Sequence, residues 1–208
     1  MKLFPIMLNL KGRTVLVIGG GVVALRKVKI LSEFGADITV ISEKFIEDFN
    51  KFDIEKIKLK INEAKDLEPF MAGRVLVIVA TNDKKLNELS EQLCNKYNIL
   101  CNRVDFRESS AIFAAILKKR DIIVSISSSG TIPSFSVFLR DKIAGQIEIY
   151  MPALEILKKV RETIKIRDYE ARKKLFNEIL NNEEFWHNIK IGNLQNAEII
   201  AKKIGGIE

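Results

Sequence analysis

The sequence predicts an α/β protein built on a doubly wound parallel sheet, and two patterns support this. A short apolar run at 15–18 is followed at once by three glycines and then by a helical pattern from Ala24. Further short apolar runs at 36–42, 74–80 and 99–101 alternate with helical stretches. Runs of this length suit buried strands, and strands that alternate with helices form parallel sheets.

Local signals set the individual elements. Gly35 is typical of a helix C-terminus, and Asn82 and Asp83 are suited to cap the next long helix. The expected elements are an extended lead-in at 1–9 that covers one sheet edge, strands at 14–18, 36–42, 54–61, 74–80 and 99–101, a partly helical stretch at 43–53, helices at 24–35, 84–97, 134–149 and 153–166, and hairpin strands at 111–117 and 122–127.

The pattern changes after Asp105. Two strands joined by the four residues 118–121 predict a β-hairpin, and a small-residue loop at 128–133 precedes the next helix. The remaining chain is helical and charged. We therefore predict three domains, namely a Rossmann-like nucleotide-binding domain over 1–112, a small α+β segment over 113–150 and a helical C-terminal domain over 151–208.

Bulk properties exclude several classes of function. The net charge of +7 is spread thinly and forms no long basic block, which disfavours binding to nucleic acid. No apolar run is long enough to span a membrane, and Lys11 and Arg13 interrupt any signal-peptide pattern. Two cysteines, Cys94 and Cys101, are too few for a disulfide framework. These observations predict a cytoplasmic protein.

The glycine run after the first strand has the form of a dinucleotide site. In this pattern Gly19 makes the tight turn, Gly21 lets the backbone approach a pyrophosphate, and Ala24 lets the helix pack close to the strand. Amides at the helix N-terminus then face the phosphates. A plain structural turn is the alternative, because glycine serves any turn that needs a positive φ.

The residues after the second strand bear on which nucleotide binds. An acid usually ends this strand and holds the ribose hydroxyls, but here Ser42 stands at that position and Glu43 follows. Glu43 could reach the ribose diol and favour NAD, whereas Lys44 could meet a 2′-phosphate. We favour NAD.

The fourth and fifth strands bring polar residues to the carboxyl edge of the sheet, where ligands bind in such folds. Residues 80–82 end the fourth strand, and 101–105 end the fifth. Asp105 carries a carboxylate at neutral pH, since its unperturbed pKa is about 3.9, and can accept a proton beside a nicotinamide. The alternative is that Asp105 caps a turn or pairs with Arg103 or Arg107.

Six motifs occur in one order along the chain. They are Phe4-Pro5-Ile6, the run Gly19 to Lys27, Ala80-Thr81-Asn82-Asp83, Cys101-Asn102-Arg103-Val104-Asp105, the run Ser127 to Pro133, and Leu139-Arg140-Asp141-Lys142. Together they resemble the precorrin-2 dehydrogenase/sirohydrochlorin ferrochelatase family, the N-terminal part of siroheme synthase. One departure is Ser129, which stands where the family loop commonly has glycine.

The resemblance implies a function and an assembly. It implies NAD-dependent oxidation of precorrin-2 to sirohydrochlorin, in bifunctional members also insertion of Fe²⁺ to give siroheme, and a homodimer in which residues after about 112 interlock. The essential carboxylate falls on Asp105. The expected cofactor contacts are Gly19, Gly20, Gly21, Val22, Val23, Ser42, Glu43, Lys44, Ala80, Thr81 and Asn82, and the expected substrate contacts are Asn102, Arg103, Ser128, Ser129, Gly130 and Thr131.

Other interpretations stay open. The chain could be a dehydrogenase without chelatase activity, or a regulatory NAD-binding module that binds nucleotide without reducing it. Four cations, Arg103, Arg107, Arg140 and Lys142, are suited to the carboxylates of the tetrapyrrole, although each could equally form an ordinary surface ion pair. We predict no protein metal site, because His187 is the single histidine and no Cys/His cluster has metal-ligand spacing.

Overall fold

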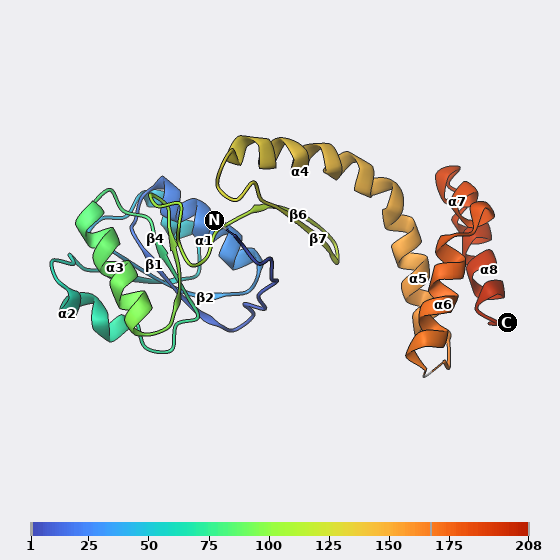
Figure 1. Ribbon diagram of the computed structural model, residues 1–208, viewed down its shortest axis with the longest axis horizontal. Coiled ribbons are helices and arrows are strands. Elements are labelled where there is room, and N and C mark those ends of the chain that lie inside the picture. Colours follow the sequence, from blue (N-terminus) through green and yellow to red (C-terminus); the bar gives the residue numbers. More distant parts are fainter. Residues whose placement is uncertain (1, 167, 208) are drawn as a thin grey trace. The chain divides into compact units, whose positions relative to one another are not determined.

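The structure is a computed structural model that describes residues 2–166 and 168–207. The chain alternates strands and helices before it turns to helices alone (Figure 1). The elements, with 3-10 helices written η, are β1 (Thr14–Ile18), α1 (Val22–Glu33), β2 (Asp37–Ser42), η1 (Glu47–Lys51), β3 (Glu55–Lys58), α2 (Ala64–Leu67), η2 (Glu68–Phe70), β4 (Leu76–Val79), α3 (Lys84–Lys96), β5 (Leu100–Arg103), β6 (Ala115–Lys119), β7 (Ile122–Ile126), α4 (Pro133–Ile147), η3 (Glu148–Tyr150), α5 (Met151–Thr163), α6 (Tyr169–Leu180), α7 (Glu183–Lys190) and α8 (Leu194–Ile204).

The first five strands form a parallel sheet in the order β3-β2-β1-β4-β5. The pairing brings the carboxyl ends of the strands to one edge. Ile18 at the end of β1 pairs with Ile41 and Val79, and Val79 pairs with Arg103. The predicted Rossmann-like fold class is therefore confirmed, and the ends of β1, β2, β4 and β5 lie side by side where ligands bind in such sheets.

Both faces of this sheet are buried, as expected of a parallel sheet between helices. Side chains alternate along β1, so that Val15 and Val17 face α1 while Leu16 and Ile18 face α2 and α3. All four are at most 1% exposed, and each such side chain stabilises the fold by roughly 1.5–3 kcal/mol. The two cores fix how the helices lie against the sheet.

The same alternation assigns the side chains of β5 to opposite faces. Cys101 pairs with Val77 and belongs to the core under α3, whereas Asn102 pairs with Ile78 of the core under α1. Arg103 returns to the α3 side, where it contacts Glu91 of that helix. Two neighbouring polar residues of β5 thus serve different sides of the sheet.

Several predicted boundaries hold for clear local reasons. Gly35 has a φ of +71° just after α1, and the amide of Ala36 donates to Leu31 O at 3.2 Å. Asp83 caps α3, because its carboxylate accepts from the amides of Lys85 and Leu86. Helix α2 was not predicted, although Glu63 and Asp66 form a capping box there.

Two expectations differ from the structure. The lead-in does not cover a sheet edge in its described part, because Phe4, Ile6 and Met7 are 86%, 59% and 66% exposed. The first hairpin strand begins at Ala115 rather than at residue 111. Residues 111–113 instead close the sheet domain, where Ala111 bonds to the backbone of β5 and Phe113 packs against the core under α1.

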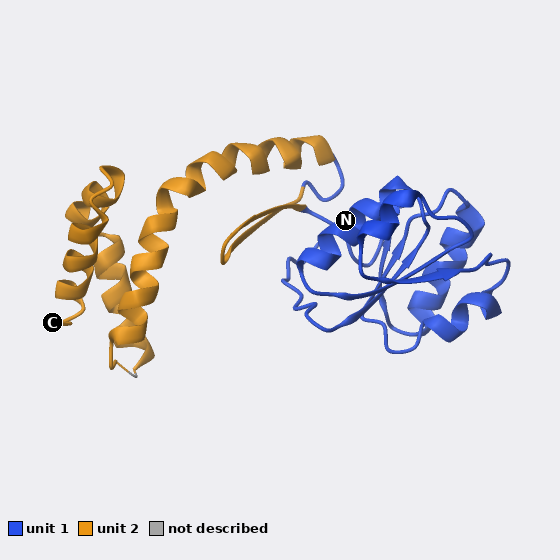
Figure 2. Ribbon diagram, turned by 180° about the vertical axis from the view of Figure 1, so that it is seen from behind, with its two compact units in different colours: residues 1–114, 128–132 blue, residues 115–127, 133–208 orange. Residues whose placement is uncertain are grey.

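The chain divides into two compact units (Figure 2). One comprises residues 1–114 and 128–132, and the other comprises 115–127 and 133–208. In the second unit, β6 and β7 form an antiparallel pair against α4, and helices α5 to α8 enclose a separate core around Val160, Ile179 and Phe185. The three-domain division stays a prediction beside this description.

None of the helices in the described residues is long and apolar enough to cross a membrane.

Candidate active site

The glycine loop is held by close backbone contacts on two sides. Gly19 has a φ of +123°, and a Cβ placed on it would lie 2.3 Å from Ala80 O. A Cβ on Gly20 would lie 2.0 Å from Lys44 O. Gly21 differs from both, because a Cβ there would meet nothing within 4 Å. Gly19 and Gly20 therefore pack the loop against its neighbours, while Gly21 borders open space.

That open space lies at the N-terminus of α1. Gly21 is the N-cap, no side chain caps this end, and no acidic residue lies in the first turn. Val22 and Val23 are 55% and 44% exposed. The first helical amides are therefore available to an anion, and the helix dipole favours negative charge there. The residues present fit the diphosphate of a dinucleotide.

The turn after β2 is held by one side-chain hydrogen bond and by one backbone hydrogen bond to the glycine loop. Ser42 Oγ donates to Lys44 O at 2.7 Å, and the Ile46 amide donates to Gly20 O at 3.0 Å. The predicted contact Ser42 therefore shapes this turn. The Glu43 and Lys44 side chains are exposed, so both candidate contacts to the ribose or its phosphate remain accessible.

The segment that follows β4 is joined to α3 by two hydrogen bonds between Thr81 and Asn87. Thr81 Oγ1 donates to Asn87 Oδ1 at 2.5 Å, and Asn87 Nδ2 donates back to Thr81 O at 3.1 Å. The carbonyl of Ala80 packs closely against Gly19, and Asn82 is exposed. These three predicted cofactor residues therefore occupy the same edge as the glycine loop.

Asp105 follows β5 at this edge, in a turn. Its carboxylate accepts two hydrogen bonds at 3.1 Å from Arg103, one from Nε to Oδ1 and one from Nη2 to Oδ2. This Arg103 fork holds the pKa of Asp105 below its usual range, against partial burial, and a hydrogen bond from Asn87 adds to the effect. The Asp105 side chain is 26% exposed, so the ionised carboxylate still reaches solvent.

Arg103 is almost fully buried, with 8% of its side chain exposed. Its third nitrogen, Nη1, donates to Glu91 Oε2 of α3 at 2.8 Å, and its guanidinium lies 4.8 Å from the centre of the Phe106 ring. The expectation that Asp105 pairs with Arg103 is thus met. Arg103 stays a predicted substrate contact, and its guanidinium is bound to two carboxylates of the protein.

Asn102 is 6% exposed and lies on the opposite side of β5 from Arg103. Its Nδ2 donates to Ala111 O at 2.9 Å. Its Oδ1 has no hydrogen-bond partner among the described residues. A buried acceptor without a donor is uncommon in native structures, which marks Asn102 as a residue to test in the site.

The predicted substrate loop belongs to the same compact unit as Asp105. Arg107 joins them, because its Nη2 donates to Thr131 Oγ1 at 2.8 Å and its Nε donates to Ser129 O at 3.4 Å. Ser128 Oγ accepts from the Ile132 amide at 3.1 Å, which closes the loop on itself. The structure thus connects the loop around Gly130 to the segment that carries Asp105.

The two remaining predicted cations lie on α4, in the second unit. Arg140 pairs with its neighbour Asp141 at 2.7 Å, and Lys142 lies 5.5 Å from the centre of the Phe138 ring.

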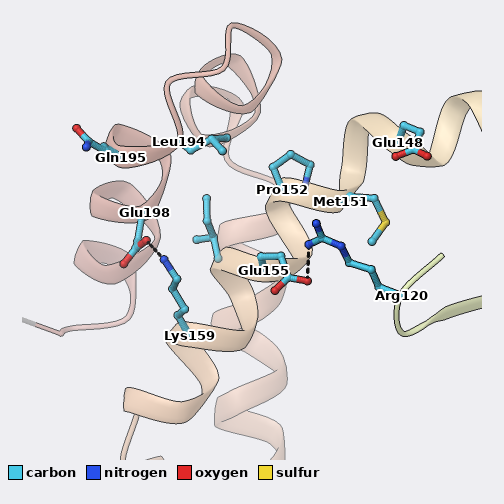
Figure 3. Close-up of a pocket in the computed structure, with 10 residues that line it drawn as sticks. Arg120, Glu148, Met151, Pro152, Glu155, Lys159, Leu194, Gln195 and Glu198 are labelled. Carbon is cyan, nitrogen blue, oxygen red and sulfur yellow. Dashed lines mark hydrogen bonds and ion pairs between the residues drawn. The ribbon is translucent and has the colours of Figure 1, made fainter.

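The second unit contains a cavity of about 510 Å³ (Figure 3). It is lined by residues of α5, α8, η3 and the hairpin turn, and none of the predicted site residues lines it. Its two cations are paired with carboxylates, Arg120 with Glu155 at 3.0 Å and Lys159 with Glu198 at 2.7 Å. The charged groups of this cavity neutralise one another in ion pairs, so the cavity is not a candidate catalytic site.

No cluster of three or more His, Cys, Asp or Glu residues that could hold a metal ion occurs within residues 2–166 and 168–207. His187 lies exposed on α7.

The sequence analysis missed three residues around the site. Asn87 and Glu91 are polar residues on the inner face of α3, spaced four apart, and this pattern on a buried face could have drawn attention to them. Lys27 of α1 ends the motif that begins at Gly19, but the sequence predicts no role for its side chain. Burial lowers the pKa of Lys27 to about 8, and its ammonium lies 3.9 Å from the centre of the Phe113 ring.

Comparison with known proteins adds independent evidence. A family model described as "Putative NAD(P)-binding" matches residues 6–115. The siroheme synthase of Baumannia cicadellinicola is 37% identical over 207 residues, which cover 95% of this chain and 43% of that protein. The siroheme synthase of Blochmanniella pennsylvanica is 40% identical over 148 residues, covering 69% of this chain and 30% of that protein. The chain spans less than half the length of these curated relatives.

Among solved structures, the one titled "SirC, precorrin-2 dehydrogenase" superposes with a TM-score of 0.76 and 22% sequence identity. The match covers 97% of this chain and 100% of that one. At 22% identity this likeness is evidence for the fold alone, and it covers nearly the whole length of the chain.

Proposed function

Because the chain belongs to the precorrin-2 dehydrogenase family of the siroheme synthase N-terminal region, with an NAD(P)-binding domain at 6–115, we propose that it oxidises precorrin-2 to sirohydrochlorin. We further propose NAD⁺ as the oxidant. The balanced reaction converts precorrin-2 and NAD⁺ into sirohydrochlorin, NADH and H⁺. One bond of the macrocycle therefore loses a hydride and a proton, and the protein must place an acceptor for each.

The observation that carries this proposal is the meeting of two features at one edge of the sheet. The uncapped N-terminus of α1 follows β1, and Asp105 follows β5, while the register places the ends of β1, β4 and β5 side by side. A diphosphate site and an ionised carboxylate at the same edge are what an oxidation by hydride and proton removal requires.

The residues of the chain divide the work as follows. Amides of the first turn of α1 bind the diphosphate, and exposed Glu43 is placed to accept from the ribose hydroxyls. When bound, the nicotinamide supplies the hydride acceptor. Asp105 takes the proton at a carboxylate oxygen. The Arg103 fork keeps the pKa of Asp105 low, so the carboxylate is ionised at neutral pH and readily passes the proton on to water.

The substrate carries several carboxylates, and the chain offers cations and donors for them. Arg107 reaches the loop at 128–131, whose serine and threonine hydroxyls and backbone amides can donate to a carboxylate. Arg140 and Lys142 on α4 are further candidates. Asn102 Oδ1 has the opposite preference, because a free acceptor suits an N–H group of the ligand rather than a carboxylate.

The direct test is anaerobic incubation of the purified protein with precorrin-2 and NAD⁺, in which NADH absorbance and the spectrum of the oxidised macrocycle should appear together. A parallel reaction with NADP⁺ should run more slowly, which tests the choice of Glu43 over Lys44. The Asp105→Asn variant should fold and bind NAD⁺ but lose turnover at least a hundredfold, in keeping with loss of a general base. Binding of NAD⁺ without any turnover would instead favour a regulatory module.

Insertion of iron is a separate activity that bifunctional members of the family carry out. Incubation with sirohydrochlorin and Fe²⁺ in the absence of NAD⁺ distinguishes a bifunctional enzyme from one that only dehydrogenates. Formation of siroheme above the rate without protein would assign the chelatase activity to this chain.

We propose a homodimer as the working form. Helix α4 exposes several apolar side chains in its N-terminal half, and Ser136 is its one buried residue. Phe135, Val137 and Phe138 are 51%, 40% and 52% exposed, and the two phenylalanine rings stack with their centres 6.1 Å apart. Large exposed apolar patches of this kind mark protein interfaces, and a second copy of the chain is the partner that the family resemblance suggests.

A further inference from the structure

The interface between α3 and β5 is built in successive layers that end at Asp105. Cys94 and Cys101 contact each other through their thiols within the core, and the next layer joins Glu91 to Arg103 at 2.8 Å. Arg103 in turn binds Asp105 through two nitrogens. The polar contacts of Glu91 and Arg103 therefore lie next to the buried cysteine pair, and the partly exposed carboxylate of Asp105 lies at their solvent side.

These contacts engage all three nitrogens of Arg103 and hold its guanidinium in one orientation. Two of its three nitrogens bind Asp105 and the third binds Glu91, so two carboxylates fix the plane of the guanidinium. With 8% of the side chain exposed, a guanidinium nitrogen that lost its partner would be buried without compensation. Removal of Glu91 would therefore drive Arg103 to rotate toward water, and this rotation would break the fork on Asp105.

We propose that Glu91 is a positioning residue for proton transfer, which acts on Asp105 through Arg103. This inference deepens the proposed function and rests on it. Glu91 does not touch the reacting atoms. It holds the guanidinium on α3, and the guanidinium aligns both oxygens of the Asp105 carboxylate with the edge of the sheet where the substrate must bind.

The test compares turnover of three variants with the wild type. Glu91→Ala should lower kcat about tenfold and leave KM for NAD⁺ within about twofold, because the glycine loop is untouched. Glu91→Gln should restore kcat to within about threefold, since its amide oxygen can accept from the same nitrogen. Glu88→Ala, on the exposed side of the same helix, should match the wild type.

The pH profile separates positioning from a general loss of stability. Arg103 lowers the pKa of Asp105, so release of the fork in Glu91→Ala should raise that pKa and move the acid limb of the kcat profile to higher pH. If Glu91→Ala does not fold, Glu91→Asp replaces it, because aspartate keeps the charge but its shorter side chain draws the carboxylate away from Nη1 of Arg103. The same tenfold loss and the same shift are expected.

Two results would overturn the inference. One is a kcat and an acid limb in Glu91→Ala, or in Glu91→Asp, that equal those of Glu88→Ala. The other is a loss in Glu91→Gln as large as that in Glu91→Ala, which would make the residue structural. If Asp105→Asn loses turnover while these variants keep it, the positioning role alone fails. If Asp105→Asn keeps turnover, the proposed function itself fails.

Discussion

Ser129 adopts a left-handed backbone conformation, with a φ of +53°, at the position where the resembling family commonly has glycine. Residues other than glycine pay roughly 1–2 kcal/mol for this conformation, because the Cβ crowds the backbone. The neighbouring Gly130 has a φ of +74° and needs no such strain. Ser129 therefore carries strain in the loop that Arg107 holds.

Replacement of Ser129 by glycine should relieve that strain. We expect Ser129→Gly to raise the free energy of unfolding by about 0.5 kcal/mol, since the greater freedom of glycine in the unfolded chain offsets part of the gain. The reverse change, Gly130→Ser, should lower it, because its Cβ would lie 3.1 Å from Arg107 Cγ at a positive φ. Urea unfolding of both variants measures the two effects. A change in the free energy of unfolding that has the same sign in both variants would contradict this account.

Lys27 makes stability depend on pH. Burial lowers the pKa of Lys27 to about 8 in the folded chain, whereas an unfolded lysine has a pKa near 10.5. Between these two pH values the unfolded chain binds the proton that the folded chain has released. The free energy of unfolding therefore gains a contribution that rises from pH 8 to pH 10.5.

Lys27→Met should remove this rise and, at pH 7, stabilise the protein by about 1 kcal/mol, because no charge is then buried. Lys29→Met is the matched control, since Lys29 is exposed on the same helix. Unfolding by urea at pH 7 and pH 10 gives the comparison. If the free energy of unfolding still rises with pH in Lys27→Met, another titrating group causes that rise.

At the scale of elements, the turn between β1 and α1 separates glycines that support the fold from one that leaves room for a ligand. Gly19→Ala should destabilise the protein by about 3 kcal/mol, because the new Cβ would meet Ala80 O at 2.3 Å at a φ of +123°. Gly21→Ala meets no atom and should change stability by less than about 1 kcal/mol.

Gly21→Ala should weaken NAD⁺ binding without a large loss of stability, whereas Gly19→Ala should mainly lower stability. Gly21→Ala places a methyl group in the space proposed for the diphosphate, so the Kd for NAD⁺ should rise at least tenfold while the thermal midpoint stays near that of the wild type. Isothermal titration and thermal unfolding measure the two properties. Unchanged NAD⁺ affinity in Gly21→Ala would argue for the plain structural turn.

The sequence predicted the strands and helices and the edge of the sheet that carries the site. It did not predict which side chains contact one another there. The glycines at 19–21 and the cap at Asp83 are local signals, since turn geometry and capping depend on residues close in the chain. The contact of Glu91 with Arg103 depends on how α3 rotates over β5, which only the packed cores decide. The late start of β6 has the same origin, because Ala111 and Phe113 complete a core rather than a strand pair.

At the scale of the whole molecule, the apolar surface of α4 predicts the assembly. The wild type should sediment at twice the mass of one chain. Phe138→Asp should shift it toward the monomer, because a charge would be buried in the proposed interface. Tyr169→Asp, an exposed aromatic on α6, is the control and should leave the dimer intact. A monomeric wild type at micromolar concentration would contradict the dimer.

The unit that contains the sheet is made of two chain segments, 1–114 and 128–132. The hairpin at 115–127 lies between these segments in the sequence and belongs to the other unit. The hydrogen bond from Arg107 to Thr131 therefore closes a ring of about 25 residues, and such closure costs about 3 kcal/mol of chain entropy. This cost grows only with the logarithm of ring size. The tip of the hairpin at Arg120 and Asp121 is thus a place where extra residues, such as a short affinity tag, can be inserted while the returning loop keeps its anchor.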